Sequence, residues 1–182
     1  YWGVKDYPIK ECVSIHKVDG YWGIFSNFAQ TPLIVKGVKF KTSEQLFQVL
    51  KFKKAEHVKE VYNAPQPKMI AKKLETLNRR ADWGMIFIDV MKFCLQTKYE
   101  QSKAFFRKLE ESKGKYIVED QSTFKKPADA WGVKLELVNK SDSEQRFAGR
   151  NLLGQLLMEL RDNGTLKYSL PDDIFDCLDY LK

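Results

Sequence analysis

The sequence contains few of the side chains that most often hold metals or form disulfides. Among its 182 residues are two histidines, His16 and His57, and three cysteines, Cys12, Cys94 and Cys177. An odd number of widely spaced cysteines does not fit a disulfide framework, and with so few histidines no zinc-site spacing arises. We therefore expect no metal and a reducing compartment. Cys94 and Cys177 lie in apolar helical patterns and are expected to be buried.

Long hydrophobic runs and biased segments are also missing. No stretch approaches the roughly 18 consecutive apolar residues that a membrane helix needs. The first residues, 1–6, lack the charged-then-apolar pattern of a secretory signal. There is no internal repeat, low-complexity tract or linker. We expect one domain over residues 1–182, located in the cytoplasm or nucleus and not bound to a membrane.

The sequence is rich in apolar residues and has an excess of basic residues over acidic ones. Hydrophobic residues make up 43% and aromatic residues 13% of the chain, which is enough for a core and excludes general disorder. The formal net charge is +7 and the pI is about 9.2. This modest basic excess favours anionic partners such as nucleotides or nucleic acid.

The pattern of apolar residues and turn signals predicts short strands followed by a long helical region. The predicted strands span 12–16, 23–28, 33–35, 38–40, 116–119 and 131–138. The predicted helices run from 42 to about 111 with breaks at 65–67 and 78–82, from 151 to 162, and from 171 onward. The sum is a helix-rich α+β domain with a small antiparallel or mixed sheet.

The segment Thr42-Ser43-Glu44-Gln45 has the form of a helix capping box. Thr42 is expected to cap the helix, and Gln45 is expected to bond back to the Thr42 amide. Glu44 then lies in the first turn. The residues that share its side of the helix are Phe47, Gln48 and Lys51. A carboxylate here can simply complement the helix dipole, but in a partly apolar pocket it can act as a general acid or base.

A second motif, Phe25-Ser26-Asn27-Phe28, closes an apolar segment. Serine and asparagine at such a position commonly make turn hydrogen bonds. The alternative is functional: Ser26 and Asn27 hold a ribose hydroxyl or a phosphate while the Phe28 ring stacks on a base.

A third motif, Gly149-Arg150-Asn151, precedes the predicted helix 151–162. Gly149 has no Cβ and permits close approach of another group, and amides at a helix start can bind an anion. Tight packing of the backbone is the ordinary explanation, and a phosphate site formed by Gly149, Arg150 and Asn151 is the functional one.

Trp131 stands in a polar setting, since Asp129 precedes it and Glu119 ends the strand before. Tryptophans more often belong to a core than to a binding site. A tryptophan beside a glycine and between two acidic residues, however, also suits the stacking of a planar base.

The order of these motifs resembles the NADAR superfamily, also called YbiA-like, over residues 22 to 162. The residues that carry the resemblance are Phe25-Ser26-Asn27-Phe28, Thr42-Ser43-Glu44-Gln45-Leu46-Phe47-Gln48, Lys51-Phe52, Val90-Met91, Lys98-Tyr99, Trp131-Gly132, Gly149-Arg150-Asn151-Leu152-Leu153-Gly154, Leu157-Met158 and Arg161.

The resemblance implies a helix-rich N-glycosidase fold that needs no metal or cofactor. Family members hydrolyse ribosylamine intermediates of riboflavin biosynthesis or remove ADP-ribose from guanine bases. It places the active-site glutamate at Glu44. The other residues that it matches to the family's site are Ser26, Asn27, Phe28, Trp131, Gly149 and Asn151.

Three departures from the family pattern stand out. The family often has a histidine after the catalytic glutamate, where this chain has Gln45. Only Ala130 separates Asp129 from Trp131, which leaves the alignment of Asp129 open. Residues 120–126 and 138–145 resemble lineage-specific loops.

We therefore expect an N-glycosidase in which Glu44 acts near C1′ of a ribose. Lys51 would tune its pKa or contact the ligand, Trp131 and Phe28 would sandwich the base or ribose, and Arg150 with the helix start would hold phosphate. Gln48, Glu119 and Asp129 complete the predicted substrate-binding set. The basic charge favours ADP-ribosylated guanine in DNA or RNA as the substrate. The alternatives are phosphorylated ribosylaminopyrimidines, or a non-catalytic reader of ADP-ribose or nucleic acid.

Overall fold

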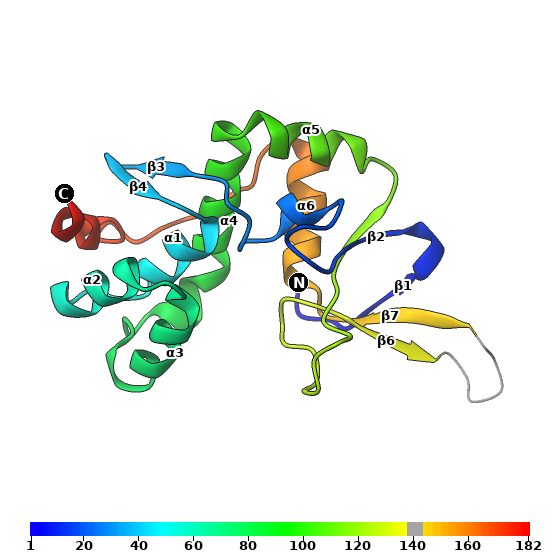
Figure 1. The fold of residues 1–182 in the computed structure, drawn as a ribbon, viewed down its shortest axis with the longest axis horizontal. Helices are drawn as coiled ribbons and strands as arrows, with labels where there is room; N and C mark the ends of the chain where they lie inside the picture. The colour runs from blue at the N-terminus through cyan, green and yellow to red at the C-terminus, as the bar shows by residue number, and fades with distance from the viewer. Residues whose placement is uncertain (138–143) are drawn as a thin grey trace. The chain divides into compact units, whose positions relative to one another are not determined.

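The computed structural model describes residues 1–137 and 144–182, which fall into two compact units (Figure 1). The sheet unit comprises Tyr1–Ser26 and Lys103–Leu166, and the helical unit comprises Asn27–Ser102 and Lys167–Lys182. The mixture of helices and small sheets confirms the predicted α+β class. The assignment of the whole chain to one domain stays a prediction.

The helical unit is built around a short buried helix, α1. Its elements are β3 (Leu33–Val35), β4 (Val38–Phe40), α1 (Ser43–Val49), α2 (Ala55–Asn63), α3 (Pro67–Asn78), α4 (Trp83–Gln101) and the 3-10 helix η3 (Asp176–Leu181). Helices α2, α3 and α4 all pack against α1. Every residue of α1 is buried as a result, the polar ones included.

The β3–β4 hairpin follows directly from its sequence. Leu33 and Val35 alternate with exposed Ile34, and the turn residues Lys36 and Gly37 both have positive φ. A two-residue turn of this kind matches the twist of the strands that it joins. The pairing of Leu33 with Phe40 confirms the predicted strands 33–35 and 38–40 and joins them in an antiparallel hairpin.

Most of the predicted helix breaks are confirmed. Pro67 occupies the first position of α3, where its missing N–H costs nothing, and α3 ends at Asn78 before α4 begins. The breaks at 50–54 and at Ser102 were not predicted. Met85, which the periodicity places in the core, is 89% exposed.

The prediction of a last helix from Pro171 is wrong. The chain makes single turns there, with the amide of Ile174 bonded to the carbonyl of Pro171, and only η3 follows. The side chain of Asp173 accepts hydrogen bonds and ion pairs from Arg80 and Lys53. Tertiary ion pairing therefore engages a carboxylate that could otherwise stabilise the first turn of a helix.

Within the described residues, the sheet unit contains two small sheets, two α-helices and two 3-10 helices. Its elements are β1 (Lys5–Pro8), η1 (Ile9–Glu11), β2 (Cys12–Ile15), η2 (Gly23–Phe25), α5 (Lys103–Glu111), β5 (Tyr116–Glu119), β6 (Lys134–Leu137), β7 (Gln145–Gly149) and α6 (Leu152–Asn163). One sheet is antiparallel in the order β1-β7-β6, and the other pairs β2 with β5 in parallel. Strands β1 and β7 were not predicted.

Helix α6 packs closely on β5, and Gly154 makes this possible. A Cβ on Gly154 would lie 2.0 Å from the carbonyl oxygen of Ile117, so no other residue fits. Gly164, with φ of 74°, ends the helix as predicted. Nearby, Tyr7, Val118, Val133 and Phe147 form a buried cluster of this unit.

One strand predicted near this unit, 23–28, is wrong, and another, 131–138, is confirmed only in part. Residues 23–28 do not form a strand: Gly23–Phe25 is a 3-10 helix, and a Cβ on Gly23 would lie 1.8 Å from the carbonyl oxygen of Val18, so only glycine allows this tight turn. The strand predicted at 131–138 begins only at Lys134, and its last residue, 138, lies outside the described residues, as does most of the predicted loop 138–145.

The cysteines agree with their predicted role. Cys94 and Cys177 are buried free thiols, and burial raises the pKa of Cys177 to about 12. Among residues 1–137 and 144–182, no helix is long and apolar enough to cross a membrane. Nor does the described part of the chain gather three or more His, Cys, Asp or Glu side chains that could hold a metal ion.

Candidate functional site

The start of α1 is held in place by Asn27. The backbone carbonyl of Asn27 accepts a hydrogen bond from the Glu44 amide at 3.0 Å, and its side-chain Oδ1 accepts one from Ser43 Oγ at 2.8 Å. The Asn27 Nδ2 group donates to Met91 Sδ on α4 at 3.4 Å. Asn27 thus has an observed role as the residue that fixes the first turn of α1, while its predicted contact with substrate stays a prediction.

Of the two hydrogen bonds predicted for the capping box, the structure confirms one. Thr42 Oγ1 accepts a hydrogen bond from the Gln45 amide at 3.0 Å, which confirms the N-cap. Gln45, however, does not return to the Thr42 amide. Its Oε1 accepts from the Lys41 amide at 2.7 Å and its Nε2 donates to the Tyr62 carbonyl at 2.8 Å. Through these two hydrogen bonds, the Gln45 side chain connects the last turn of α2 to the residue that follows β4.

Glu44 is largely buried, with 7% of its surface exposed. Gln48, one turn further along α1, donates from Nε2 to Glu44 Oε1 at 2.6 Å. The Oε1 atom of Gln48 is buried and has no hydrogen-bond partner within the described residues. A buried acceptor without a partner is energetically costly.

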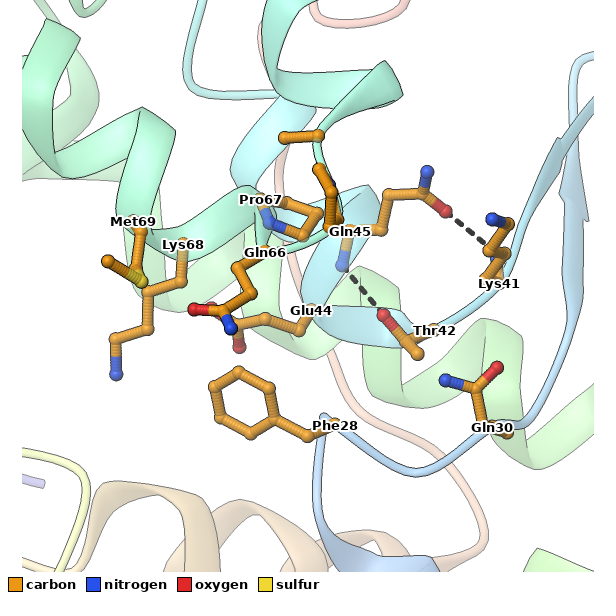
Figure 2. Close-up of a pocket in the computed structure, with 12 residues that line it drawn as sticks. Phe28, Gln30, Lys41, Thr42, Glu44, Gln45, Gln66, Pro67, Lys68 and Met69 are labelled. Carbon is orange, nitrogen blue, oxygen red and sulfur yellow. Dashed lines mark hydrogen bonds between the residues drawn. The ribbon is translucent and has the colours of Figure 1, made fainter.

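Glu44 lies at the wall of a pocket of about 420 Å³ (Figure 2). Three segments of the helical unit line the pocket: 28–30, 41–45 and 64–69. The Phe28 ring and the Gln66 side chain lie on either side of the Glu44 carboxylate (Figure 2). Among the described residues of the lining, Glu44 alone carries a carboxylate. A pocket of this size, mostly apolar with a few convergent polar groups, is typical of a small-molecule site.

The rim of the pocket combines an aromatic ring with a cation. Phe28 is 48% exposed, and the Lys68 ammonium group stands 5.6 Å from the centre of its ring. An exposed ring at the mouth of a pocket provides a stacking surface for a planar or sugar ring.

Lys51 follows the C-terminal end of α1, is buried, and does not line the pocket that contains Glu44. Its ammonium group lies 3.7 Å from a Glu75 carboxylate oxygen and 5.5 Å from the centre of the Trp83 ring. Burial lowers its pKa, and the charges of Glu75 and Glu44 oppose that shift. The charge of Glu44 therefore acts on Lys51, while the tuning of Glu44 by Lys51 stays a prediction.

Lys98 on α4 is an ionisable group to which the sequence analysis gave no role. Its side chain is fully buried, and desolvation lowers its pKa to about 7. It lies one helical turn beyond Cys94, whose pKa is raised by burial and further by the charge of Glu44. A buried lysine that titrates near neutrality is a feature common at functional sites.

In the sheet unit, Asn151 joins α6 to β5. Its side chain is fully buried; Oδ1 accepts from the Glu119 amide at 3.0 Å and Nδ2 donates to the Ile117 carbonyl at 2.9 Å. Asn151 also adopts a left-handed conformation with φ of 53°, which asparagine tolerates better than most residues. These contacts give Asn151 a clear structural role.

The first amides of α6 are also occupied. The Leu152 and Leu153 amides donate to the carbonyls of Ala130 and Trp131 at 3.0 and 3.3 Å. A Cβ on Gly149 would lie 2.5 Å from the Gly132 carbonyl oxygen, so this glycine serves close backbone contact. The segment around Trp131 thus caps α6 instead of extending as a strand.

A phosphate site at Gly149, Arg150 and Asn151 stays a prediction. The guanidinium group of Arg150 is exposed and lies 5.4 Å from the centre of the Trp2 ring.

Asp129 has local partners as well. Its Oδ1 accepts hydrogen bonds from Gln121 Nε2 and from the Trp131 amide, both at 2.9 Å, and its own amide donates to Gln121 Oε1. Asp129 therefore organises the loop before Trp131. Substrate binding by Glu119, Asp129 and Trp131 stays a prediction.

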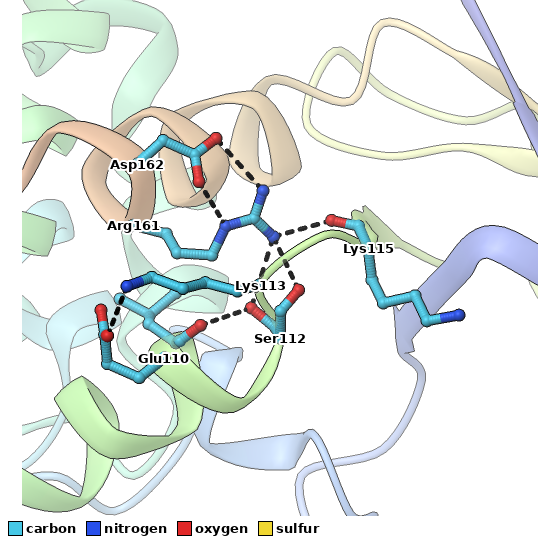
Figure 3. A network of polar contacts seen from close by, with 7 residues as sticks. Glu110, Ser112, Lys113, Lys115, Arg161 and Asp162 are labelled. Atoms are coloured by element: carbon cyan, nitrogen blue, oxygen red, sulfur yellow. Dashed lines mark hydrogen bonds and ion pairs between the residues drawn. The ribbon is translucent and has the colours of Figure 1, made fainter.

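Arg161 is one of the residues that carry the family resemblance, and its side chain connects parts of the fold (Figure 3). Its guanidinium donates to the carbonyls of Ser112 and Lys115 at 3.0 and 2.7 Å and pairs with Asp162 at 2.7 Å. These carbonyls belong to the turn that follows α5. Arg161 therefore fastens the α5–β5 connection to α6.

Of the predicted site residues, the structure brings Phe28 and Glu44 to one pocket, with Gln48 bonded to Glu44. Ser26 is buried at the end of η2 in the sheet unit, where its amide donates to the Gly23 carbonyl. Sequence reasoning missed the wall formed by residues 64–69. The signal was present in Pro65-Gln66-Pro67, which we interpreted only as a helix break although it also indicates a rigid loop.

Comparison with known proteins agrees with this architecture. The NADAR domain model matches residues 13–163. The chain is 29% identical over 153 residues to proteins named N-glycosidase YbiA from Escherichia coli (strain K12) and Shigella boydii serotype 4 (strain Sb227), covering 82% of this chain and 86% of each relative. It also matches the NMR structure of the E. coli protein YbiA with a TM-score of 0.61 and 27% identity, over 84% of this chain and 83% of that one. The chain belongs to the NADAR domain family.

Proposed function

We propose that the protein is an N-glycosidase that hydrolyses the bond between a base nitrogen and C1′ of ribose, with Glu44 as its catalytic acid or base. The observation that carries the proposal is the position of Glu44 as the one carboxylate in the described lining of a largely apolar pocket. Relatives with the name N-glycosidase support the reaction type.

The reaction places simple demands on the protein. Hydrolysis breaks the C1′–N bond and one O–H bond of water; the oxygen ends on C1′ and the proton on the leaving nitrogen. The transition state has oxocarbenium character, which a nearby carboxylate stabilises. Glu44 can protonate the leaving nitrogen or accept the proton of the water, and Gln48 keeps its carboxylate in one orientation through the 2.6 Å hydrogen bond.

For the substrate we propose guanine bases of DNA or RNA that carry ADP-ribose. The formal charge of +7 supports a polyanionic substrate, and Lys41 and Lys68 at the Glu44 pocket supply positive charge where it is needed. The exposed Phe28 ring offers a stacking surface for the base or the ribose.

The test uses an oligonucleotide ADP-ribosylated on guanine, with release of ADP-ribose followed by mass spectrometry. We expect turnover by the wild type and a loss of about 10²–10⁴-fold in the Glu44→Gln variant, since general acid–base catalysis contributes that much. Glu56→Gln is the matched control, because Glu56 also lies in the first turn of a helix but is exposed.

Each other outcome has a definite meaning. Near-normal turnover by Glu44→Gln shows that another group carries the chemistry. Absence of turnover by a folded wild type rejects this substrate, and phosphorylated ribosylaminopyrimidines become the next substrate to test. Tight binding of ADP-ribose or nucleic acid without product from any of them identifies a non-catalytic reader.

A further inference from the structure

A second hollow adjoins the pocket that contains Glu44. Its volume is about 690 Å³. The residues that line both hollows are Gln30, Lys41, Gln45, Ala64 and Pro65. Because the two hollows share these residues, they lie side by side, and a ligand seated at Glu44 is close to the second hollow. Each hollow alone has the volume of an ordinary small-molecule site, so the pair suits a ligand larger than one nucleoside.

The lining of the second hollow is basic and polar. Lys39 and Lys41 are exposed, and neither forms an ion pair with any described residue. Within the described part of the chain no carboxylate lines it, and Gln30, Tyr62 and Asn63 add polar side chains. Two unpaired ammonium groups without a neighbouring carboxylate favour an anionic ligand.

The backbone that carries both lysines is fixed by hydrogen bonds. Gln45 joins the Lys41 amide to the Tyr62 carbonyl at 2.7 and 2.8 Å, and the Tyr62 hydroxyl donates to the Lys39 carbonyl at 2.6 Å. The Tyr62 ring also packs edge-on against Phe40, with ring centres 5.6 Å apart. The hollow is therefore built before any ligand arrives, and a ligand does not have to order this backbone.

We propose that the second hollow is a phosphate-binding subsite, in which Lys39 and Lys41 bind the phosphate groups of the substrate whose ribosyl bond lies at Glu44. This inference rests on the proposed function, because it takes the Glu44 pocket as the place where the bond is cut. The phosphate belongs either to the diphosphate of an ADP-ribosyl group or to the backbone of the polynucleotide.

The test is the double variant Lys39→Gln with Lys41→Gln. Both changes remove charge and keep the Lys41 amide that bonds to Gln45. Lys73→Gln is the matched control, since Lys73 is exposed but lines neither hollow. Calorimetry measures binding of ADP-ribose, of unmodified oligonucleotide and of phosphate-free ribose, and steady-state kinetics measures turnover of ADP-ribosylated oligonucleotide.

We expect the double variant to bind phosphorylated ligands about tenfold more weakly or worse, since two charge-assisted contacts are lost. KM should rise by a similar factor while kcat stays close to the wild type, and binding of phosphate-free ribose should not change. Weaker binding of ADP-ribose identifies the diphosphate as the ligand, whereas weaker binding of the oligonucleotide alone identifies the backbone.

Equal affinity of wild type and double variant for both phosphorylated ligands overturns the subsite, even when the wild type turns the substrate over. Conversely, a lysine-dependent loss of ADP-ribose binding supports the subsite when no turnover is seen, and only the proposed reaction then fails. Equal weakening in the Lys73→Gln control also overturns it, because the effect would then be one of overall charge.

Discussion

The two units use their polar motif residues in different ways. In the helical unit, Phe28 and Glu44 line a pocket, and the Gln48 amide is bonded to the Glu44 carboxylate. In the sheet unit, Asn151 and Arg161 are bonded to backbone groups that join helices to strands and turns. Motif residues of one family thus line a pocket in one unit and connect backbone segments in the other. Substitutions that separate activity from stability can test this contrast.

The largest effect on stability is expected for Asn151→Ala. The change leaves the Glu119 amide and the Ile117 carbonyl without their partner in a fully buried position, and alanine is strained at a φ of 53°. We expect a loss of about 3 kcal/mol in the free energy of unfolding, measured by chemical denaturation. The control is Asn163→Ala at the exposed end of α6. Unchanged stability with lost activity would move Asn151 into the substrate site.

A smaller loss is expected for Arg161→Lys. Lysine keeps the charge but cannot reach the Ser112 and Lys115 carbonyls together with Asp162, as the planar guanidinium does (Figure 3). We expect about 2 kcal/mol less stability in urea unfolding. Arg107→Lys, an exposed change on α5, should have almost no effect. Full stability of the Arg161→Lys variant would show that these hydrogen bonds contribute little.

The third prediction concerns how stability depends on pH. Burial lowers the pKa of Lys98 to about 7, so above that pH the unfolded chain binds more protons at this residue than the folded chain does. The contribution of Lys98 to stability therefore rises with pH, from about pH 7 up to the ordinary lysine pKa. The slope is at most about 1.4 kcal/mol per pH unit.

Urea unfolding of the wild type and of Lys98→Met between these pH values measures that slope. The methionine variant should lose the rise with pH, whereas the exposed control Lys72→Met should retain it. Parallel pH profiles for wild type and Lys98→Met would mean that the lysine is protonated in the folded protein.

Local sequence signals predicted those parts of the fold that local physics determines. The alternation in 33–40 with its Lys36-Gly37 turn specified the hairpin, and Thr42 specified the start of α1. The failures occurred where specific contacts that no local pattern signals decide the conformation. At Gly23 the requirement is a backbone approach to Val18, and Asp173 is held by Arg80 from elsewhere in the chain.

The same limit applies to the candidate site. Glu44 and Phe28 stood out because each belongs to a recognisable motif, and the pocket does contain both. The opposite wall, 64–69, comes from the connection between α2 and α3 and the first turn of α3, where Pro65-Gln66-Pro67 indicates a rigid loop but no binding role. The reach of Gln45 to Tyr62 could not be predicted either, since it depends on how α2 packs beside β4.

The prolines that frame this wall have a kinetic consequence. Pro65 and Pro67 flank Gln66 at the mouth of the pocket, and their rings restrict the backbone on both sides. A pocket wall edged by such residues has few conformations to exchange between. For the proposed N-glycosidase reaction, this predicts a rate set by bond cleavage or by dissociation of the product, and not by movement of residues 65–67.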